Sequence, residues 1–433
     1  MHKITVAVVV FWGIHACVAA QNANMFAGNK MQTLQSFIDS AYQNSAVIKD
    51  NQNKLSYSGL NLKQTLAEVS GPKIFVASEV LLAPYVNNGR DVFTPYPADK
   101  AIGYDAAVTN GGLYSATANA TVPLFTAANK KAYRQLSTAE TEAYTNQIEL
   151  TKHELEQQVT GQYVQCYLSE LQMDYQQKAI ALLEDEKLVV KNLVVSGLDK
   201  QSDYMLMGIE IQTQKILWSQ YRTDYTTSLL QLKTLCGIND TAVVMIAAPE
   251  IEVRQLNEQS KFLKIYRTDS LQIMASQNIF NLKYKPSLNL YANGGLNAVE
   301  LPGIQKKFGL SAGLTFNWML YDGKQKKLEQ QKNALLLNTS QNYRTGFLKQ
   351  HELQKQNALK EISNINGMIA QKAQQLTDYG KLLQVYKLQL AQGQISVTDY
   401  LNTVRSYNDL QRDIALAGIN KLQVINEYNY LNW

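Results

Sequence analysis

The sequence contains few residues of the kinds that carry catalysis, metal binding or disulfide bonds. Its 433 residues include 3 cysteines, 4 histidines and 8 prolines. Cys166 and Cys236, the two cysteines beyond the N-terminal segment, are too few for a disulfide framework and lack metal-ligand spacing. Both lie in helical patterns, where we expect small buried side chains. His153 and His351 lie among charged neighbours, which predicts a solvated helix face.

The sequence also lacks the signatures of nucleotide and nucleic-acid sites. It has no glycine-rich phosphate loop and no metal-spaced cluster of cysteine and histidine. The formal net charge of +5 is spread without a basic run or an acidic tail, whereas nucleic-acid binding requires clustered Lys and Arg. We therefore predict that the chain is not an enzyme, binds no nucleic acid and uses no cofactor or metal.

Long apolar runs are confined to the N-terminus. Residues 1–20 have a basic start at Lys3, an apolar core and small residues before Gln21, as in a cleaved secretory signal. Cys17 offers an alternative, because the residues before it loosely resemble a lipidation signal. Either outcome exports the protein. Later stretches fall short of the roughly 20 apolar residues of a spanning helix, so a membrane span would have to consist of strands.

Proline placement divides the remaining chain. Residues 124–248 and 303–433 contain no proline and are rich in good helix formers. Strand-like and loop-like sequence lies between these stretches. We expect strands near 72–85, 112–125, 286–294 and 308–318, and long helices near 126–195, 202–236, 323–392 and 398–431. At 1.5 Å per residue, each of the two longest helices would extend roughly 100 Å.

The two halves of the sequence repeat one another. A shift of 196 residues superimposes Gly197 on Gly393 and Ser202-Asp203-Tyr204 on Thr398-Asp399-Tyr400. The same shift aligns the second and fourth predicted strands. Such a period is far longer than a solenoid unit and indicates duplication of a whole strand–helix module. We expect a first repeat at 21–236 and a second at 237–433.

Each predicted strand separates an apolar face from a polar face. In the fourth strand, for example, Leu310, Ala312 and Leu314 alternate with Ser311 and Thr315. This alternation fits any half-buried antiparallel sheet, but it also fits strands between lipid and a wet lumen. Four strands cannot close a barrel in lipid, where an open edge leaves backbone groups unsatisfied. If the strands span a membrane, several chains must therefore share one barrel.

The long helices carry apolar residues at alternating spacings of three and four. The clearest series lies at the end of the helix predicted near 323–392: Leu376, Tyr379, Leu383, Tyr386 and Leu390. This rhythm is typical of coiled-coil packing, and it predicts that the helices form long antiparallel hairpins.

The order of elements and the two helix–helix turns resemble those of the TolC family of outer-membrane channels. The first turn carries Gly197-Leu198 followed by Ser202-Asp203, and the second carries Gly393 followed by Thr398-Asp399. The resemblance covers essentially the whole chain after the signal segment. It implies an α+β membrane protein: a homotrimer whose twelve strands form one outer-membrane barrel that continues into a periplasmic helical tunnel.

The resemblance also implies a function and partners. The trimer would be the exit channel of a tripartite efflux or type I secretion system of a Gram-negative bacterium. It would receive substrates from a proton-driven or ATP-driven inner-membrane pump and dock a periplasmic adaptor, the membrane fusion protein. Outer-membrane lipid would surround the barrel. The turn residues that would contact the adaptor are Ser196, Gly197, Leu198, Ser202, Gly393 and Thr398.

The same resemblance implies roles for three residues at the periplasmic entrance. Asp399 matches an aspartate whose three copies form an acidic ring, and Asn402 occupies the place of a second ring without its charge. Asp203 matches a residue that links neighbouring hairpins. Its basic partner would lie two residues after Gly393, where this chain has Ile395. The alternative for both aspartates is helix capping, with Ser202 or Thr398 as further candidate caps.

A different class of protein also accounts for part of the pattern. A secreted coiled-coil structural or adhesion protein would explain the long helices and the signal segment. It would not explain the paired strand modules with one dry and one wet face.

Overall fold

The computed structural model describes residues 31–87, 93–94, 102, 112–257, 259–299 and 301–433. The predicted signal segment and Cys17 lie outside these residues. The chain divides into two units, described separately below. The sheet unit comprises Gln52–Asn146 and Lys264–Arg344, and the helix unit comprises the residues up to Asn51, Gln147–Leu263 and Thr345–Trp433.

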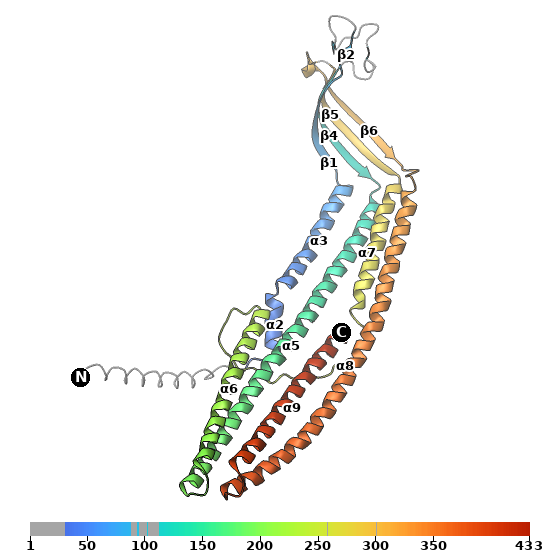
Figure 1. Ribbon diagram of the computed structural model, residues 1–433. Helices are drawn as coiled ribbons and strands as arrows, with labels where there is room; N and C mark the ends of the chain where they lie inside the picture. Colours follow the sequence, from blue (N-terminus) through green and yellow to red (C-terminus); the bar gives the residue numbers. More distant parts are fainter. Residues whose placement is uncertain (1–30, 88–92, 95–101, 103–111, 258, 300) are drawn as a thin grey trace, which may run out of the picture. The chain divides into compact units, whose positions relative to one another are not determined.

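The elements follow one another as short helix, strands, long helices and then the same again (Figure 1). The first half contains α2 (Leu34–Asn44), α3 (Ala46–Ser70), β1 (Lys73–Leu82), β2 (Tyr85–Val86), β3 (Phe93–Thr94), β4 (Gly112–Leu124), α5 (Ala127–Val195) and α6 (Gln201–Leu235). The second half contains α7 (Leu263–Asn281), η1 (Leu282–Tyr284), β5 (Ser287–Ala298), η2 (Ile304–Lys306), β6 (Phe308–Asn317), α8 (Gln325–Ala391) and α9 (Val397–Leu431).

The sheet unit contains a four-stranded antiparallel sheet in the order β1-β4-β5-β6. Its register places the apolar faces of all four strands on one side: Ile74 lies opposite Ala120, which faces Ala292, which faces Ala312. This side is exposed, and Leu310 retains 80% of its accessible surface. The apolar face is therefore continuous and open in a single chain.

The other side of the sheet is mostly polar. One row across it contains Phe75, Asn119, Asn293 and Ser311, and the Ser311 hydroxyl donates to Asn293 Oδ1 at 2.7 Å. Phe75 is an exception to the polar character of this face. Cross-strand pairs of this kind add to the stability of a sheet, and their common register separates a dry face from a wet one.

Strand β5 extends further than the sequence pattern indicates, to Ala298 rather than residue 294. The pair Gly294-Gly295 reads as a strand end in the sequence, yet both residues pair with β4. A Cβ atom on Gly295 would lie 2.2 Å from the Ala116 carbonyl oxygen. Glycine is used here for close backbone approach rather than for chain reversal.

The paired long helices end at matching positions. Helices α5 and α8 contain 69 and 67 residues, and α6 and α9 contain 35 residues each. The ends of α5 and α8, and both ends of α6 and α9, differ by 196 positions, which is the shift found in the sequence. Among the described residues, no helix has the length and hydropathy needed to cross a membrane.

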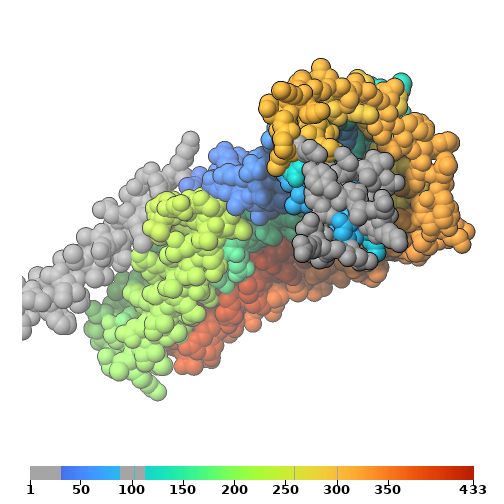
Figure 2. Space-filling model, turned by 90° about the horizontal axis from the view of Figure 1, so that it is seen from above, coloured from blue at the N-terminus to red at the C-terminus, as the bar shows by residue number. Residues whose placement is uncertain are grey.

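The helix unit has a core built from α2, α5, α6 and the segment after α6. Phe37, Tyr163, Tyr225 and Leu232 are central to it. Cys166 and Cys236 are fully buried there, as predicted, and burial raises the pKa of the Cys166 thiol to about 12. Both thiols are structural rather than reactive. In the space-filling view, α6 in light green and α9 in red lie together at one end of this unit (Figure 2).

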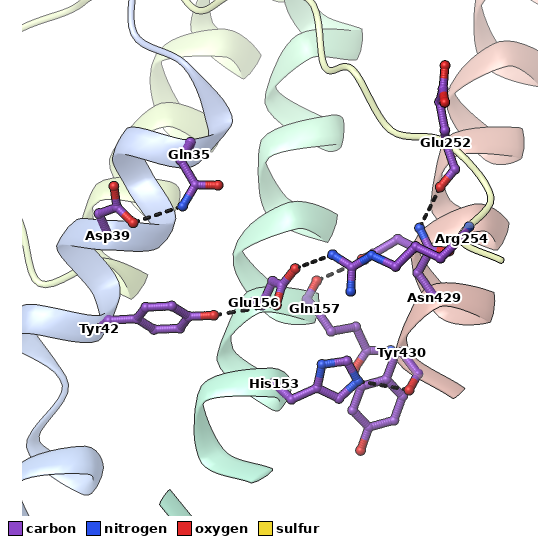
Figure 3. Close-up of polar contacts among 11 residues, drawn as sticks. Gln35, Asp39, Tyr42, His153, Glu156, Gln157, Glu252, Arg254, Asn429 and Tyr430 are labelled. Carbon is purple, nitrogen blue, oxygen red and sulfur yellow. Dashed lines mark hydrogen bonds and ion pairs between the residues drawn. The ribbon is translucent and has the colours of Figure 1, made fainter. Parts of the chain in front are cut away.

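Side-chain amides at the C-terminal end of α9, from Asn429 in the helix and Asn432 directly after it, hold the segment that joins the two halves. Asn429 accepts from the Arg254 backbone N–H at 2.9 Å and donates to the Glu252 carbonyl at 2.8 Å (Figure 3). Asn432, three residues on, binds Asn257 and Gln255 in the same way. Each amide supplies one donor and one acceptor, so it satisfies a backbone C=O and a backbone N–H of the joining segment, as a neighbouring strand would.

The same region contains a network of polar side chains. Glu156 on α5 accepts from Arg254 Nη2 at 2.6 Å and from the Tyr42 hydroxyl at 3.4 Å (Figure 3). The carboxylate thereby ties α2 to α5 and to the joining segment. Burial, together with the nearby Glu156 carboxylate, raises the pKa of Tyr42 to about 12.

The solvated helix face predicted for the two histidines is wrong. His153 and His351 are 6% and 5% exposed. His153 stacks between Tyr430 and Trp433, with ring centroids 4.9 and 4.7 Å away, and His351 stacks on Phe347 at 4.7 Å. The charged sequence neighbours lie on other faces of the same helices, while the imidazoles join an aromatic cluster. Burial lowers the pKa of both histidines.

Candidate functional site at the two helix hairpin turns

The two turns between long helices have the same backbone structure. Helix α5 ends at Val195 and α6 begins at Gln201, and α8 ends at Ala391 and α9 begins after Ser396. Gly197 and Gly393 have φ values of +75° and +66°. These left-handed residues end the helices as the sequence pattern predicts.

The hydrogen bonds of the two turns match as well. The Gly197 N–H donates to the Val194 carbonyl at 3.0 Å, and the Leu198 N–H donates to the Leu193 carbonyl at 2.9 Å. The second turn repeats both bonds at Gly393 and Gln394. This is the Schellman arrangement, in which a left-handed residue lets two N–H groups reach the last carbonyls of a helix.

The second turn is capped by Ser396 rather than by Thr398. The Ser396 hydroxyl oxygen accepts from the Asp399 N–H at 3.1 Å and donates to Asp399 Oδ2 at 2.6 Å. Ser396 is therefore an N-cap whose hydroxyl also binds the Asp399 carboxylate; the arrangement differs from a capping box, in which the carboxylate would accept from the Ser396 backbone N–H. Asp399 is exposed, so one carboxylate oxygen supports the cap while the group still faces solvent.

The first turn has a different cap chemistry. Lys200 occupies the cap position of α6 without a side-chain bond, and Ser202, like Thr398, is exposed on the helix. Asp203 instead shares a hydrogen bond with Asp199, which raises the pKa of the Asp203 carboxyl; burial adds to this effect. Two adjacent carboxyl groups cannot both ionise at their ordinary pKa.

The cation that acts on Asp203 is its neighbour Lys200 in the same turn, whose charge lowers the pKa of the Asp203 carboxyl and opposes the effect of Asp199. Ile395, in the place where the resemblance puts the basic partner, is half-buried and packs against the core beneath the turns. The inter-hairpin role of Asp203 stays a prediction from the resemblance.

The remaining predicted residues are on the surface. Asp399 and Asn402 lie one turn apart on α9, and both are exposed. In the turns, Leu198 retains 68% of its accessible surface. The other predicted contact residues are also exposed: Ser196, Gly197, Ser202, Gly393 and Thr398. Both turns lie at the same end of their helices (Figure 1), so this end presents polar groups around an exposed leucine.

One apolar core fixes the two turns to each other. Residues from all four long helices contribute to it: Leu183 and Val190 from α5, Met207 and Ile211 from α6, Leu390 from α8, and Val397, Tyr400, Leu401 and Val404 from α9. Tyr400 is fully buried. Because the hairpins share this core, their turns can separate only if packed side chains part.

Two ion pairs beside this core join the hairpins and are not evident from the sequence pattern. Glu210 on α6 is 4% exposed and binds Arg405 on α9, with Nε at 3.1 Å and Nη2 at 2.5 Å. Glu186 on α5 is 1% exposed and lies 2.7 Å from Lys387 Nζ on α8. The Glu186 carboxylate raises the pKa of Lys387.

The spacing of these acids carries the signal that would have revealed them. Glu186 follows Leu183 by three residues and precedes Val190 by four, so it occupies a core position of the apolar rhythm. Glu210 likewise follows Met207 by three. A charged residue at such a position requires a partner. Beside Glu210 and Arg405, a pocket of about 350 Å³ opens among α5, α6 and α9.

No family model and no curated protein matches the chain. Solved structures do match. The outer membrane protein VceC from Vibrio cholerae has a TM-score of 0.68 and 14% identity, covering 92% of this chain and 96% of its own. CusC has a TM-score of 0.69 and 12% identity over 94% of this chain and 93% of its own. The MtrE outer membrane channel of Neisseria gonorrhoeae, in its open state, has a TM-score of 0.63 and 13% identity, with coverages of 92% and 88%.

These matches define the class of fold. The chain has the fold of the outer-membrane factor channels, with long helices and a four-stranded sheet in the same arrangement. The long helices and the four-stranded sheet expected from the resemblance to the TolC family are therefore confirmed, whereas the trimer, the twelve-stranded barrel and the coiled-coil packing stay predictions.

Proposed function

We propose that the chain is one protomer of a homotrimeric outer-membrane exit channel. The observation that carries this proposal is the sheet, whose continuous apolar face carries exposed side chains on all four strands. An apolar surface of this kind requires cover, and a face opposite a polar row suits lipid on one side and water on the other.

The edges of the sheet support a trimer. Among the described strands, β1 pairs only with β4, and β6 pairs only with β5. Each open edge would leave backbone groups unsatisfied in lipid. Pairing β1 of one copy with β6 of the next removes the edges, and three copies give a barrel of twelve strands. The interior of such a barrel would be lined by the polar rows.

The helices would form the periplasmic part of the channel. The long hairpins would pack as coiled coils around the same axis and make a tunnel whose entrance lies at the turns. A periplasmic adaptor would bind these turns, and an inner-membrane pump would supply the substrate. Solved structures with this fold include outer membrane channels, which supports a channel and gives no support to an adhesin. The channel would serve efflux or type I secretion in a Gram-negative cell.

At the entrance, three copies of Asp399 would form a negative constriction. Carboxylate rings favour cations in narrow pores, so we expect a small, cation-selective conductance. The bond from the Ser396 hydroxyl does not compete with this role, because it uses one carboxylate oxygen of Asp399 and leaves the charge in place. Asn402, one turn further along, would line the next ring without a charge.

Planar-bilayer recording tests this proposal with three substitutions. Asp399→Asn removes the charge but keeps an oxygen for Ser396, so we expect weaker cation selectivity with little change in thermal stability. Ser396→Ala removes the cap and keeps the charge, which should cost about 1 kcal/mol of stability and leave selectivity intact. Asp378→Asn is the matched control, because Asp378 is an exposed helical aspartate paired with Lys381.

The outcomes separate the channel from its gate. If all variants conduct with the same selectivity, Asp399 is a capping residue only and the constriction lies elsewhere. If folded trimers in bilayers carry no current even after the hairpins are loosened by Arg405→Gln, the exit-channel proposal itself fails.

A further inference from the structure

Basic residues gather where the sheet joins the helices. Every junction at that end of the sheet carries at least one. Lys73 opens β1, and the first turns of α5 follow β4. These residues are defined here as the basic belt: Lys73, Lys130, Lys131, Arg134, Lys283, Lys285, Lys324, Lys326 and Lys327.

The belt retains its positive charge. Lys130, Lys131 and Arg134 form no ion pair within the part of the chain that the structure describes. Nearby carboxylates are fewer than the nine cations and offset only part of this charge. Asp322 accepts from the Tyr284 hydroxyl and from the Lys326 N–H, Glu329 pairs with Lys332 at 2.8 Å, and Glu68 is exposed near the end of α3.

Large apolar side chains border the belt on the side of the sheet. Phe125, directly after β4, is 84% exposed, and Trp318 and Tyr321, after β6, are 56% and 78% exposed. They continue the apolar face of the sheet toward the cations. Aromatic side chains with basic residues beyond them mark the level at which a membrane surface gives way to water.

A groove opens at the belt between α5 and α7. Its volume is about 760 Å³, and it begins at Ala127 beside Lys130, Lys131 and Arg134. Leu271 and Met274 from α7 form part of its wall and are exposed. The acidic residue of the groove, Glu142, faces Arg267 at 3.8 Å. The groove thus combines three unpaired cations with an apolar wall, a lining complementary to an anionic amphiphile.

We propose that the basic belt binds anionic phospholipid headgroups, and that the groove beside Lys130, Lys131 and Arg134 is its tightest site. The lipid phosphate would lie on the three cations, and the acyl chains would run along Phe125 and the apolar face of the sheet. The site rests on the proposed function, because the acyl chains need a membrane around the sheet. Each cation near an anionic surface adds to the attraction, which is screened by salt.

The experiment compares lipids retained by the full chain. The protein is reconstituted in phosphatidylcholine vesicles doped with phosphatidylglycerol, re-extracted in mild detergent, and its bound lipids are measured by native mass spectrometry. We expect wild type to be enriched in phosphatidylglycerol over the bulk mixture. The variant Lys130→Gln/Lys131→Gln/Arg134→Gln should lose this enrichment about tenfold.

The matched control is Lys178→Gln/Lys349→Gln/Lys360→Gln, which removes three exposed lysines from the long helices and should keep the enrichment. Equal retention of both lipids by wild type, or an unchanged triple belt variant, would overturn the inference. Displacement of the lipid by millimolar inorganic phosphate would identify a free-phosphate site and would also overturn it.

Co-flotation with vesicles after an alkaline wash separates this inference from the proposed function. If the chain inserts into phosphatidylcholine vesicles but shows no lipid preference, the belt proposal alone fails. If it inserts into vesicles of neither composition, the membrane assignment of the sheet fails with it.

Discussion

At the scale of single residues, Gly197 and Gly393 are fixed by backbone angle and not by space. A Cβ atom at either position would meet no neighbour within 4 Å. The requirement comes from the positive φ values of +75° and +66°, which cost a residue with a side chain about 1–2 kcal/mol. The absence of nearby atoms at these two glycines therefore does not mean that a side chain is tolerated there.

This distinction gives a prediction. Gly393→Ala should lower the free energy of unfolding by about 1–2 kcal/mol, measured by thermal or denaturant unfolding of the purified protein. Gly367→Ala is the control: Gly367 is exposed within α8 and equally free of neighbours, so alanine should raise stability by about 0.5–1 kcal/mol. Equal effects at both glycines would contradict the role of the left-handed turn.

The buried histidines make stability depend on pH. His153 faces the Tyr430 carbonyl at 2.8 Å, with Glu156, Arg254 and Lys261 nearby; His351 faces Lys355 and Glu352. Burial lowers both pKa values below 6.5 in the folded chain. The unfolded chain therefore binds protons first as the pH falls, and stability declines below about pH 6.5 until the folded pKa is passed.

We expect the unfolding midpoint of wild type to fall between about pH 7 and pH 5 more steeply than that of His153→Phe/His351→Phe. Phenylalanine keeps the aromatic stacking and removes the titration. Each variant is compared with its own stability at neutral pH, so a general loss of stability in the double variant does not affect the result. Parallel curves for the two proteins would show that other groups control the acid response.

At the scale of elements, the sequence pattern predicts the long helices well because their signal is repeated. Proline-free stretches, the apolar rhythm and the shift of 196 positions all indicate the same helix ends. The apolar and polar faces of each strand were also accessible, since a period of two assigns each side chain to one face; the pairing register came from the structure. Short signals were less reliable: Gly294-Gly295 reads as a strand end, yet the close approach to β4 keeps β5 extended.

The contact partners of individual side chains were not accessible from the pattern. The cap of α9 is Ser396 because its hydroxyl reaches Asp399, although Thr398 is equally good by type. His153 is buried because Tyr430 and Trp433 fold over it. Glu210 is buried because Arg405, 195 positions later, neutralises it. In each case, contacts in the folded chain determine which residue forms the cap or is buried, and composition alone does not indicate this.

We expect the ion pair of Glu210 with Arg405 to stabilise the contact between the two hairpins. Arg405→Gln would leave a buried carboxylate without its cation, and we expect a loss of about 2 kcal/mol, below the usual 3–5 because the arginine side chain is 54% exposed. Glu210→Leu/Arg405→Met should recover most of that loss. Denaturant unfolding of the three proteins measures the coupling. A double variant as unstable as Arg405→Gln would mean that packing, not charge, is responsible.

At the scale of the whole molecule, the open edges of the sheet predict the oligomer. We expect the protein extracted in mild detergent to have the mass of three chains by light scattering, and to migrate as a heat-modifiable species on gels. Edge pairing supplies many backbone hydrogen bonds at once, so the trimer should resist dilution. A monodisperse monomer that still carries the four-stranded sheet would rule out the shared barrel.

The matched turns have a consequence for any partner that meets them. Three chains would present six turns with one backbone shape but two sets of side chains. The first turn of each chain carries the paired carboxyl groups of Asp199 and Asp203, and the second carries the Ser396–Asp399 cap. The ring of six turns would have nearly sixfold symmetry in its backbone shape but only threefold symmetry in its charge. A ring-shaped partner of six identical subunits could fit every turn, yet alternate subunits would meet different charges. In the proposed trimer, the internal repeat would therefore give a docking surface with six turns of the same shape that fall into two sets of three by charge.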